Sequence, residues 1–334
     1  MKEADIRQPD HYQEFLRLAH EDAHTFFDSA LRSARPCPGC ASGRYDHAFS
    51  KSGFEFVLCT DCGTLYVNPC PAPWEFERFY RESPSARYFA DVFFPPVMEA
   101  RRERIFRPRV ERLAALCAAA GLAPKVLIDI GGGNGIFLEE WRRSHPGTHV
   151  CTIEPGARFA EVCRAKSIDV FEGLAEDANA WAGRADVVTC FEVIEHVPDP
   201  TRFVRSLLRL LRPGGGLLLT ALSSEGFDIQ VLWERANAVC PPLHLHFMSL
   251  RGFETLFARA GFSNIAIETP GQLDADIVRN AVAQDGADVL SRFDRTLIGR
   301  GEPTLSEFQR FLSRNRLSSH CSIWAGHSAS AQST

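Results

Sequence analysis

The sequence predicts an α/β protein with a doubly wound sheet, a small cysteine-rich module ahead of that sheet, and helical extensions. Two observations predict this architecture. Between residues 125 and 270, apolar runs of strand length alternate with amphipathic helical segments, which is typical of a parallel sheet with helices on both faces. Ahead of them, a short turn-rich segment holds two Cys-x-x-Cys pairs, a spacing typical of a metal site.

The N-terminal segment is expected to be helical, because apolar side chains recur at helical spacing from Tyr12 to Leu31 and Pro36 ends the pattern. An aromatic segment, residues 74–94, follows the cysteine-rich module. We expect it to pack that module against the rest of the chain, or to form a lid. The arginines from 101 to 112 are interpreted as a solvated helix face, with contact to a phosphate as the alternative.

The predicted sheet begins at Lys125, where the run KVLIDI is typical of a buried strand. Helical segments separate it from the strands that follow. A late strand is expected at 263–269, and the chain after it is expected to be helical until the polar tail HSASAQST. The remaining predicted strands lie at residues 149–154, 168–173, 185–194 and 216–222.

A glycine cluster directly follows the first strand, in the pattern D-x-G-x-G-x-G from Asp129 to Gly135. Glycines allow the backbone to turn tightly and to lie against a ligand at a helix N-terminus. Glu154 ends the second strand about 20 residues later, where an acidic side chain meets the hydroxyls of a bound ribose. The position that the dinucleotide pattern reserves for a third glycine is Ile136, so a nucleoside site of another kind is predicted.

Four motifs in order, VLIDIGGGNG, CTIEPG, ADVVTCFEVIEHVPDP and LLRPGGGLLLT, resemble those of class I S-adenosylmethionine methyltransferases, which have a Rossmann-like sheet. The resemblance implies that Glu154 holds the ribose. Relatives often carry an acid near the adenine, and Glu176 or Asp177 is the candidate here. The full set of cofactor-binding residues that the resemblance implies is Asp129, Gly131, Gly133, Gly135, Glu154, Glu176, Asp177 and Phe191.

The cysteine pairs Cys37/Cys40 and Cys59/Cys62 are separated by 18 residues and can close a tetrahedral four-thiolate site, which suits Zn²⁺. Four cysteines fill the coordination shell, so the zinc is expected to be structural. The segment CTDCGTLYVNPCPAP resembles the N-terminal zinc ribbon of methyltransferases that modify sugars, glycans or secondary metabolites. The other seven cysteines are expected to be small buried apolar residues.

The fourth strand is followed by Glu192, Glu195 and His196, at the sheet edge where open α/β folds bind ligands. Beyond the fifth strand, His244 and His246 alternate with apolar residues. The residues expected to be catalytic are His196, His244, His246 and Glu195, with a histidine as general base; simple loop capping is the alternative.

A divalent cation is a third alternative for the same residues. E-x-x-E-H resembles the metal-binding pattern of some ubiquinone-pathway O-methyltransferases and of enzymes that methylate small-RNA ends. Such a cation, for example Mg²⁺, would lower the pKa of the acceptor hydroxyl. Its ligands would be Glu192, Glu195, His196 and His246.

Composition narrows the functional class further. The 334 residues are 45% hydrophobic and 24% charged, as in globular proteins, and the net charge of −5 disfavours nucleic acid as a partner. With no signal peptide and no membrane-length apolar run, we expect a cytoplasmic protein without membrane contact. The oligomeric state stays open, with a homo-oligomer as one alternative.

The sequence therefore predicts a methyltransferase that uses S-adenosyl-L-methionine on a small-molecule acceptor, with O-methylation of a sugar, glycan precursor or natural product as the main hypothesis. The alternatives are a C-methyltransferase acting on a nucleotide-linked keto-sugar, and an RNA-modifying enzyme or zinc-ribbon docking protein. The expected parts of the chain are an N-terminal helix (1–34), a zinc ribbon (35–72), a helical linker or lid (73–120), the methyltransferase domain (121–270) and a C-terminal helical extension (271–334).

Overall fold

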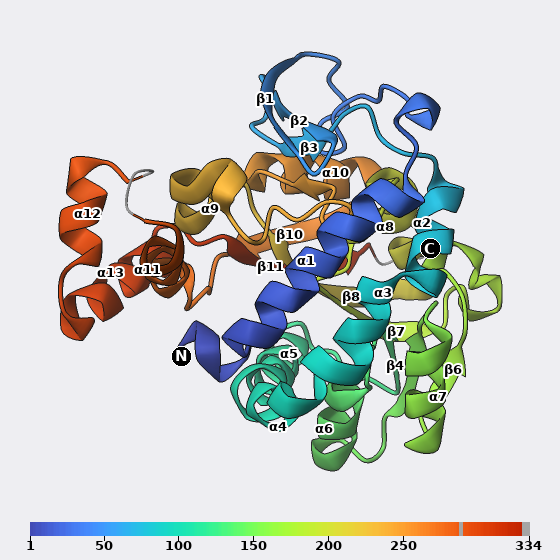
Figure 1. Ribbon diagram of the computed structural model, residues 1–334. Coiled ribbons are helices and arrows are strands. Elements are labelled where there is room, and N and C mark those ends of the chain that lie inside the picture. The colour runs from blue at the N-terminus through green and yellow to red at the C-terminus, as the bar shows by residue number, and fades with distance from the viewer. Residues whose placement is uncertain (287–289, 329–334) are drawn as a thin grey trace.

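The computed structural model describes residues 1–286 and 290–328, and its centre is a seven-stranded sheet in the order β10-β11-β8-β7-β4-β5-β6 (Figure 1). The five strands from β8 to β6 run parallel, and β11 and β10 are antiparallel. This confirms the α/β class with its doubly wound sheet. The strands are β4 Val126–Ile130, β5 His149–Ile153, β6 Asp169–Phe171, β7 Ala185–Phe191, β8 Leu211–Leu222, β10 Phe262–Glu268 and β11 His320–His327.

Helices cover both faces of this sheet because each carries an apolar side. On one face, α8 and α10 bury Phe203, Leu207 and Leu256 against the strands. On the other face, α5 and α6 bury Leu113 and Trp141. The helices around the sheet are α5 Arg107–Ala119, α6 Ile136–Ser144, α7 Ala157–Ala165, α8 Pro200–Leu210, α9 Phe227–Leu232 and α10 Leu250–Ala260.

The C-terminal segment corrects one expectation. Residues 271–334 were expected to be helical, but β11 lies inside the central sheet, between β8 and β10, and buries Cys321, Ile323 and Ala325 completely. Its antiparallel pairing with two strands distant in the sequence fixes its conformation. Three helices precede it and stand to one side of the molecule: α11 Asp274–Asp285, α12 Arg292–Ile298 and α13 Glu302–Arg314 (Figure 1). Most of the polar tail, residues 329–334, lies outside the described part.

The cysteine-rich module is a second, antiparallel sheet, in the order β1-β2-β3-β9. Its last strand, β9 (His246–Phe247), comes from the segment after β8, so the module is joined to the catalytic region by strand pairing. Arg35 adds a second link by donating to the carbonyl oxygens of Val67 and Pro198 at 3.1 and 2.6 Å. The first three strands are β1 Tyr45–Lys51, β2 Phe54–Cys59 and β3 Leu65–Val67.

Helix α1 (Pro9–Phe26) crosses the molecule from the N-terminus to the cysteine-rich sheet and packs on the aromatic segment (Figure 1). Phe15 stacks on Phe93 at 5.8 Å, and Phe27 contacts Phe76 at 4.8 Å between ring centroids. Phe76 and Phe79 of this segment also share one apolar cluster with side chains of the cysteine-rich sheet and of α9. This part of the chain consists of α2 Pro73–Glu82, α3 Pro84–Tyr88, a π-helical turn Phe89–Phe93, α4 Met98–Arg101 and a second π-helical turn Arg102–Phe106.

Short 3-10 turns make up most of the remaining regular structure: Glu3–Asp5, Ser29–Leu31, Pro95–Val97, Ala175–Asp177, Asn179–Trp181, Ile194–His196 and Trp233–Arg235.

Within the residues that the structure describes, no helix combines the length and the apolar character that crossing a bilayer requires.

Candidate active site and cysteine cluster

The glycine loop lies at the carboxyl end of β4, where the strand order reverses between β4 and β7. Gly131, Gly133 and Gly135 have φ angles of 67°, 52° and 69°, a region that side chains disfavour. A Cβ atom at Gly131 would lie 2.7 Å from Val193, whereas one at Gly133 would meet nothing within 4 Å. The backbone at Gly133 therefore faces open space at the switch point, where open α/β sheets bind ligands.

Two buried carboxyl groups flank this loop. Asp129 accepts a hydrogen bond from the Thr189 hydroxyl at 2.7 Å, and burial raises its pKa to about 7. Glu154 accepts the backbone N–H groups of Gly133 and Gly156 at 3.0 and 2.8 Å. Burial raises the pKa of Glu154 as well, and these two N–H groups oppose the shift. The structure thus brings the loop and both predicted carboxyl groups together.

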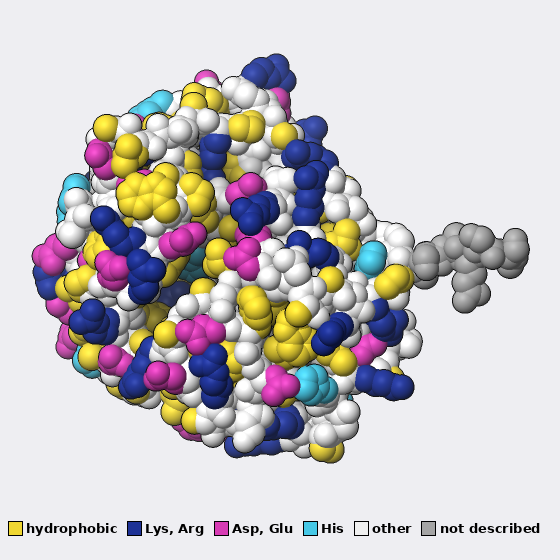
Figure 2. Space-filling model, turned by 90° about the vertical axis from the view of Figure 1, so that its right-hand side faces the viewer, with side chains coloured by type: hydrophobic (Ala, Val, Ile, Leu, Met, Phe, Trp, Pro, Cys, Tyr) yellow, Lys and Arg dark blue, Asp and Glu magenta, His cyan; other side chains and the backbone are white. Residues whose placement is uncertain are grey.

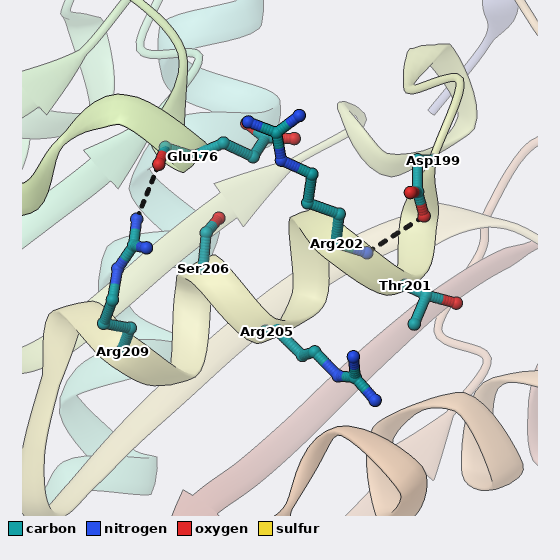
Figure 3. Close-up of a pocket in the computed structure, with 7 residues that line it drawn as sticks. All are labelled: Glu176, Asp199, Thr201, Arg202, Arg205, Ser206 and Arg209. Carbon is teal, nitrogen blue, oxygen red and sulfur yellow. Dashed lines mark hydrogen bonds between the residues drawn. The ribbon is translucent and has the colours of Figure 1, made fainter.

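Glu176 and Asp177 lie elsewhere, on the turn after β6 and beside α8. With Arg202, Arg205 and other α8 side chains, Glu176 lines a groove of about 340 Å³ (Figure 3). Asp177 is exposed, 3.9 Å from Arg202. No hydrogen bond within the described residues joins either carboxyl group to the glycine loop, and their contact with adenine stays a prediction.

The turn after β7 is fixed by the segment after β8. The Leu245 N–H donates to the Glu195 carbonyl at 2.8 Å, and Nε2 of His246 donates to the Ile194 carbonyl at 2.7 Å. His246 and Glu195 are each only 1% exposed. This burial suits residues that position the turn, and the catalytic role of both side chains stays a prediction.

His196 and His244 are less buried, and their rings lie 4.9 Å apart. Nδ1 of His196 donates to the Leu243 carbonyl at 2.8 Å, and Nδ1 of His244 donates to the Ala238 carbonyl at 2.6 Å. Burial lowers the pKa of His196 below 6.5 and that of His244 to about 3. Both imidazoles are therefore neutral at pH 7, and a proton on Nδ1 leaves Nε2 as the basic atom.

The divalent-cation site, the third alternative for E-x-x-E-H, has no support among the described residues. Glu192 turns toward Arg109 and His320, with contacts of 2.7 and 2.9 Å. Burial opposes its ionisation, but the Arg109 charge and His320 outweigh burial and hold the pKa of Glu192 well below its usual value. In the described part of the chain, the cysteine quartet is the only group of three or more potential ligands placed to share a metal ion.

The arginine stretch is a solvated face only in part, since Arg104, Arg107 and Arg112 are exposed and the other three arginines are not. Arg102 is buried and pairs with Glu140 and Glu139 at 2.5 and 3.1 Å. The Arg109 guanidinium lies 4.5 Å from the Phe191 ring, a predicted cofactor contact at the end of β7. These pairs join segments far apart in the sequence, so local charge spacing could not reveal them.

The four cysteines come together as expected. Their sulfur atoms all lie within 4.8 Å of one another, with Cys37 3.6 Å from Cys62 and Cys40 3.5 Å from Cys59. A tetrahedron with Zn–S bonds of about 2.3 Å has edges close to these distances. The quartet fits a zinc ion. Six of the other seven cysteines are buried, as expected, and Cys240 is half-buried.

A deep hollow opens on one face of the molecule, with histidine and Lys or Arg side chains on its floor (Figure 2). His196 and His244 are partly exposed, and the Tyr80 ring stands 6.5 Å from His196. Tyr80 lies on α2, within the aromatic segment for which a lid is the alternative prediction, and the packing of α2 brings it near the turn after β7.

Comparison with known proteins agrees with this geometry. Residues 98–267 match the family model described as "Methyltransferase domain". Proteins named ubiquinone biosynthesis O-methyltransferase, from Escherichia coli O127:H6 and Erwinia tasmaniensis, are 36% identical over 115 and 112 residues. These matches cover 32% and 31% of this chain and 47% and 45% of the relatives, so the chain spans about half their length.

Among solved structures, the plantazolicin methyltransferase BamL, in complex with a substrate analogue and S-adenosylhomocysteine (SAH), is similar with a TM-score of 0.51. The similarity covers 76% of this chain and 94% of that one at 12% identity. At this identity the likeness shows the fold alone.

Proposed function

The chain belongs to the methyltransferase domain family, and from this premise we propose that it transfers a methyl group from S-adenosylmethionine to a hydroxyl group of a small acceptor. The observation that carries the proposal is the pair of neutral imidazoles, His196 and His244, at the same sheet edge as the glycine loop. Removal of a hydroxyl proton requires a base that is unprotonated near neutral pH. The O-methyltransferase names of the relatives support this choice.

The glycine loop, Asp129 and Glu154 are proposed to bind the cofactor, whose sulfonium supplies an electrophilic methyl group. Glu154 would accept hydrogen bonds from the ribose hydroxyls, and the open backbone at Gly133 would lie against the ligand. The acceptor would occupy the hollow beside Tyr80. The chain's main task is then to align the acceptor oxygen and to keep water out.

His196 is proposed as the general base. Its Nδ1–H bond to the Leu243 carbonyl fixes the ring and makes Nε2 the atom that would take the hydroxyl proton. A sugar or natural-product acceptor remains our proposal for the substrate class, and zinc at the cysteine quartet remains our proposal for a structural metal.

The test is SAH release with a panel of hydroxylated acceptors, for the wild type and His196→Asn. We expect the variant to lose about 10²- to 10⁴-fold in kcat with little change in SAH affinity. His149→Asn, which alters an exposed histidine at the start of β5, is the matched control. Because burial lowers the pKa of His196, wild-type kcat/KM should fall only below pH 6.5. An inflection above 6.5, or an unimpaired His196→Asn, would rule out this base.

A further inference from the structure

A continuous set of aromatic ring contacts joins Arg7 to Arg101, and a third arginine, Arg109, binds Glu192 at the end of β7. Arg7 pairs with Glu3 at 3.2 Å, and Arg109 pairs with Glu192 at 2.7 Å. Arg101, at the end of α4, has no ion pair or hydrogen bond within residues 1–286 and 290–328. Its described contact is the face of the Phe94 ring, at 5.1 Å from the centroid.

The environment of Arg101 makes this lack of a partner costly. Its Nε atom is buried without a hydrogen-bond acceptor, and the side chain as a whole is half-buried. Burial, together with the positive charges of Arg7 and Arg109 and against the charge of Glu192, lowers the pKa of Arg101 to about 10. A desolvated cation of this kind is normally paired in proteins.

Arg101 lies in the helical segment that carries Arg109, whose guanidinium binds Glu192, four residues before His196. The charges of Arg7 and Glu192 act on the pKa of Arg101 and on that of His244. Basic and histidine side chains share the floor of the hollow in Figure 2. Arg101 also directly precedes the π-helical turn Arg102–Phe106, a distortion that is frequent at functional sites.

We propose that the acceptor carries an anionic group, a carboxylate or a phosphate, which Arg101 binds with Arg7 beside it while the hydroxyl group faces His196. This inference rests on the function proposed above. The planar guanidinium can donate two parallel hydrogen bonds to either anion. The aromatic rings of Tyr12, Tyr80 and Phe94 around the basic groups suit an acceptor with a flat apolar body.

One other anion needs to be distinguished, namely the carboxylate of the cofactor's own methionine part. The two sources predict different results. If Arg101 binds the acceptor, substitution of Arg101 leaves the affinity for SAH unchanged. If Arg101 binds the carboxylate of the cofactor, the substitution lowers the affinity for SAH, and small acids compete with SAH for the wild type.

The experiment uses the full chain saturated with SAH and compares benzoate with its neutral analogue benzyl alcohol. We expect benzoate at about ten times its Kd to raise the unfolding temperature by about 1–3 °C, and benzyl alcohol to have little effect. Arg101→Gln should weaken benzoate binding by about tenfold or more. Arg104→Gln removes an exposed arginine of the same stretch, paired with Asp5, and is the matched control.

Arg101→Lys keeps the charge and should retain part of the preference for benzoate, which separates loss of the anion site from loss of folding. Equal effects of benzoate and benzyl alcohol on the wild type would overturn the proposal. So would an Arg101→Gln variant that binds benzoate normally, or one that mainly loses SAH. Failure of the wild type to bind SAH at all would instead refute the proposed function, and calorimetry with SAH alone reports that outcome separately.

Discussion

Two carboxyl groups three residues apart, Glu192 and Glu195, meet opposite environments at the end of β7. Glu192 is held ionised by Arg109 and His320. Both carboxyl oxygens of Glu195 are buried without a hydrogen-bond partner among the described residues. Burial, followed by the nearby charge of Glu192, raises the pKa of Glu195 to about 8. Glu195 is therefore a neutral acid at pH 7, which suits a group that packs beneath the turn.

Stability should consequently depend on pH through Glu195. Below its ordinary pKa of 4.5, both states are protonated and burial carries no ionisation penalty. As pH rises toward 8, the unfolded chain ionises while the folded chain does not, so the free energy of unfolding falls. Glu195→Gln removes this dependence. We expect the variant to gain on the order of 2–4 kcal/mol relative to the wild type between pH 5 and pH 8.

Thermal unfolding at several pH values measures this difference. Glu161→Gln, which changes an exposed carboxylate on α7, is the matched control. A Glu195→Gln effect that is the same at pH 5 and pH 8 would mean that Glu195 is ionised in the folded protein.

At the scale of elements, the strand pair β3–β9 couples the cysteine cluster to the proposed acceptor side. Tyr66 of β3 pairs with His246 of β9, and Tyr66 also packs against Cys37, Cys59 and Cys62. The cysteine quartet could be predicted because two local motifs define it. The β3–β9 pair could not, since nothing in the two-residue segment His246–Phe247 distinguishes a strand from a loop.

Zinc should therefore stabilise more than the ribbon itself. We expect about one zinc ion per chain in the wild type, and loss of zinc with a lowered unfolding temperature in Cys40→Ser. Cys70→Ser alters a buried cysteine outside the quartet and should keep its zinc. Elemental analysis beside calorimetric unfolding measures both quantities. Full zinc content in Cys40→Ser, or none in the wild type, would refute the four-thiolate site.

At the scale of the whole molecule, local sequence patterns predicted the parallel strands at the centre of the fold. They did not predict the contacts between segments that are far apart in the chain. The glycine loop, Glu154 and the parallel strands each follow from spacing within a few residues. The strand β11 and the pairs that Arg109 forms with Glu192 and His320 depend on contacts across the chain. Long-range pairing decides those positions, and a single sequence carries no direct signal of it.

The proposed site also combines residues from three parts of the chain: the central sheet, the cysteine-rich ribbon and the N-terminal segment. The sheet supplies the glycine loop, Arg35 of the ribbon holds the loop after β7 through the Pro198 carbonyl, and the N-terminal third of the chain supplies Arg7, Tyr80 and Arg101. The sequence therefore predicted more of the residues proposed to bind the cofactor than of those proposed to bind the acceptor. Cofactor residues follow single strands, whereas acceptor residues come from segments nearly 240 residues apart in the chain, Arg7 and His244.

The central claim is that the glycine loop and Glu154 bind S-adenosylmethionine, and calorimetric titration of the purified protein with this cofactor and with SAH tests it most directly. We predict a Kd of about 1–100 μM for the wild type and for Glu172→Gln, an exposed carboxylate just after β6. In Glu154→Gln, binding should weaken by about 10-fold or more, since a hydrogen bond to a charged group is worth about 1.5–3 kcal/mol. Absence of binding by the folded wild type, or equal affinity in Glu154→Gln, would contradict the account.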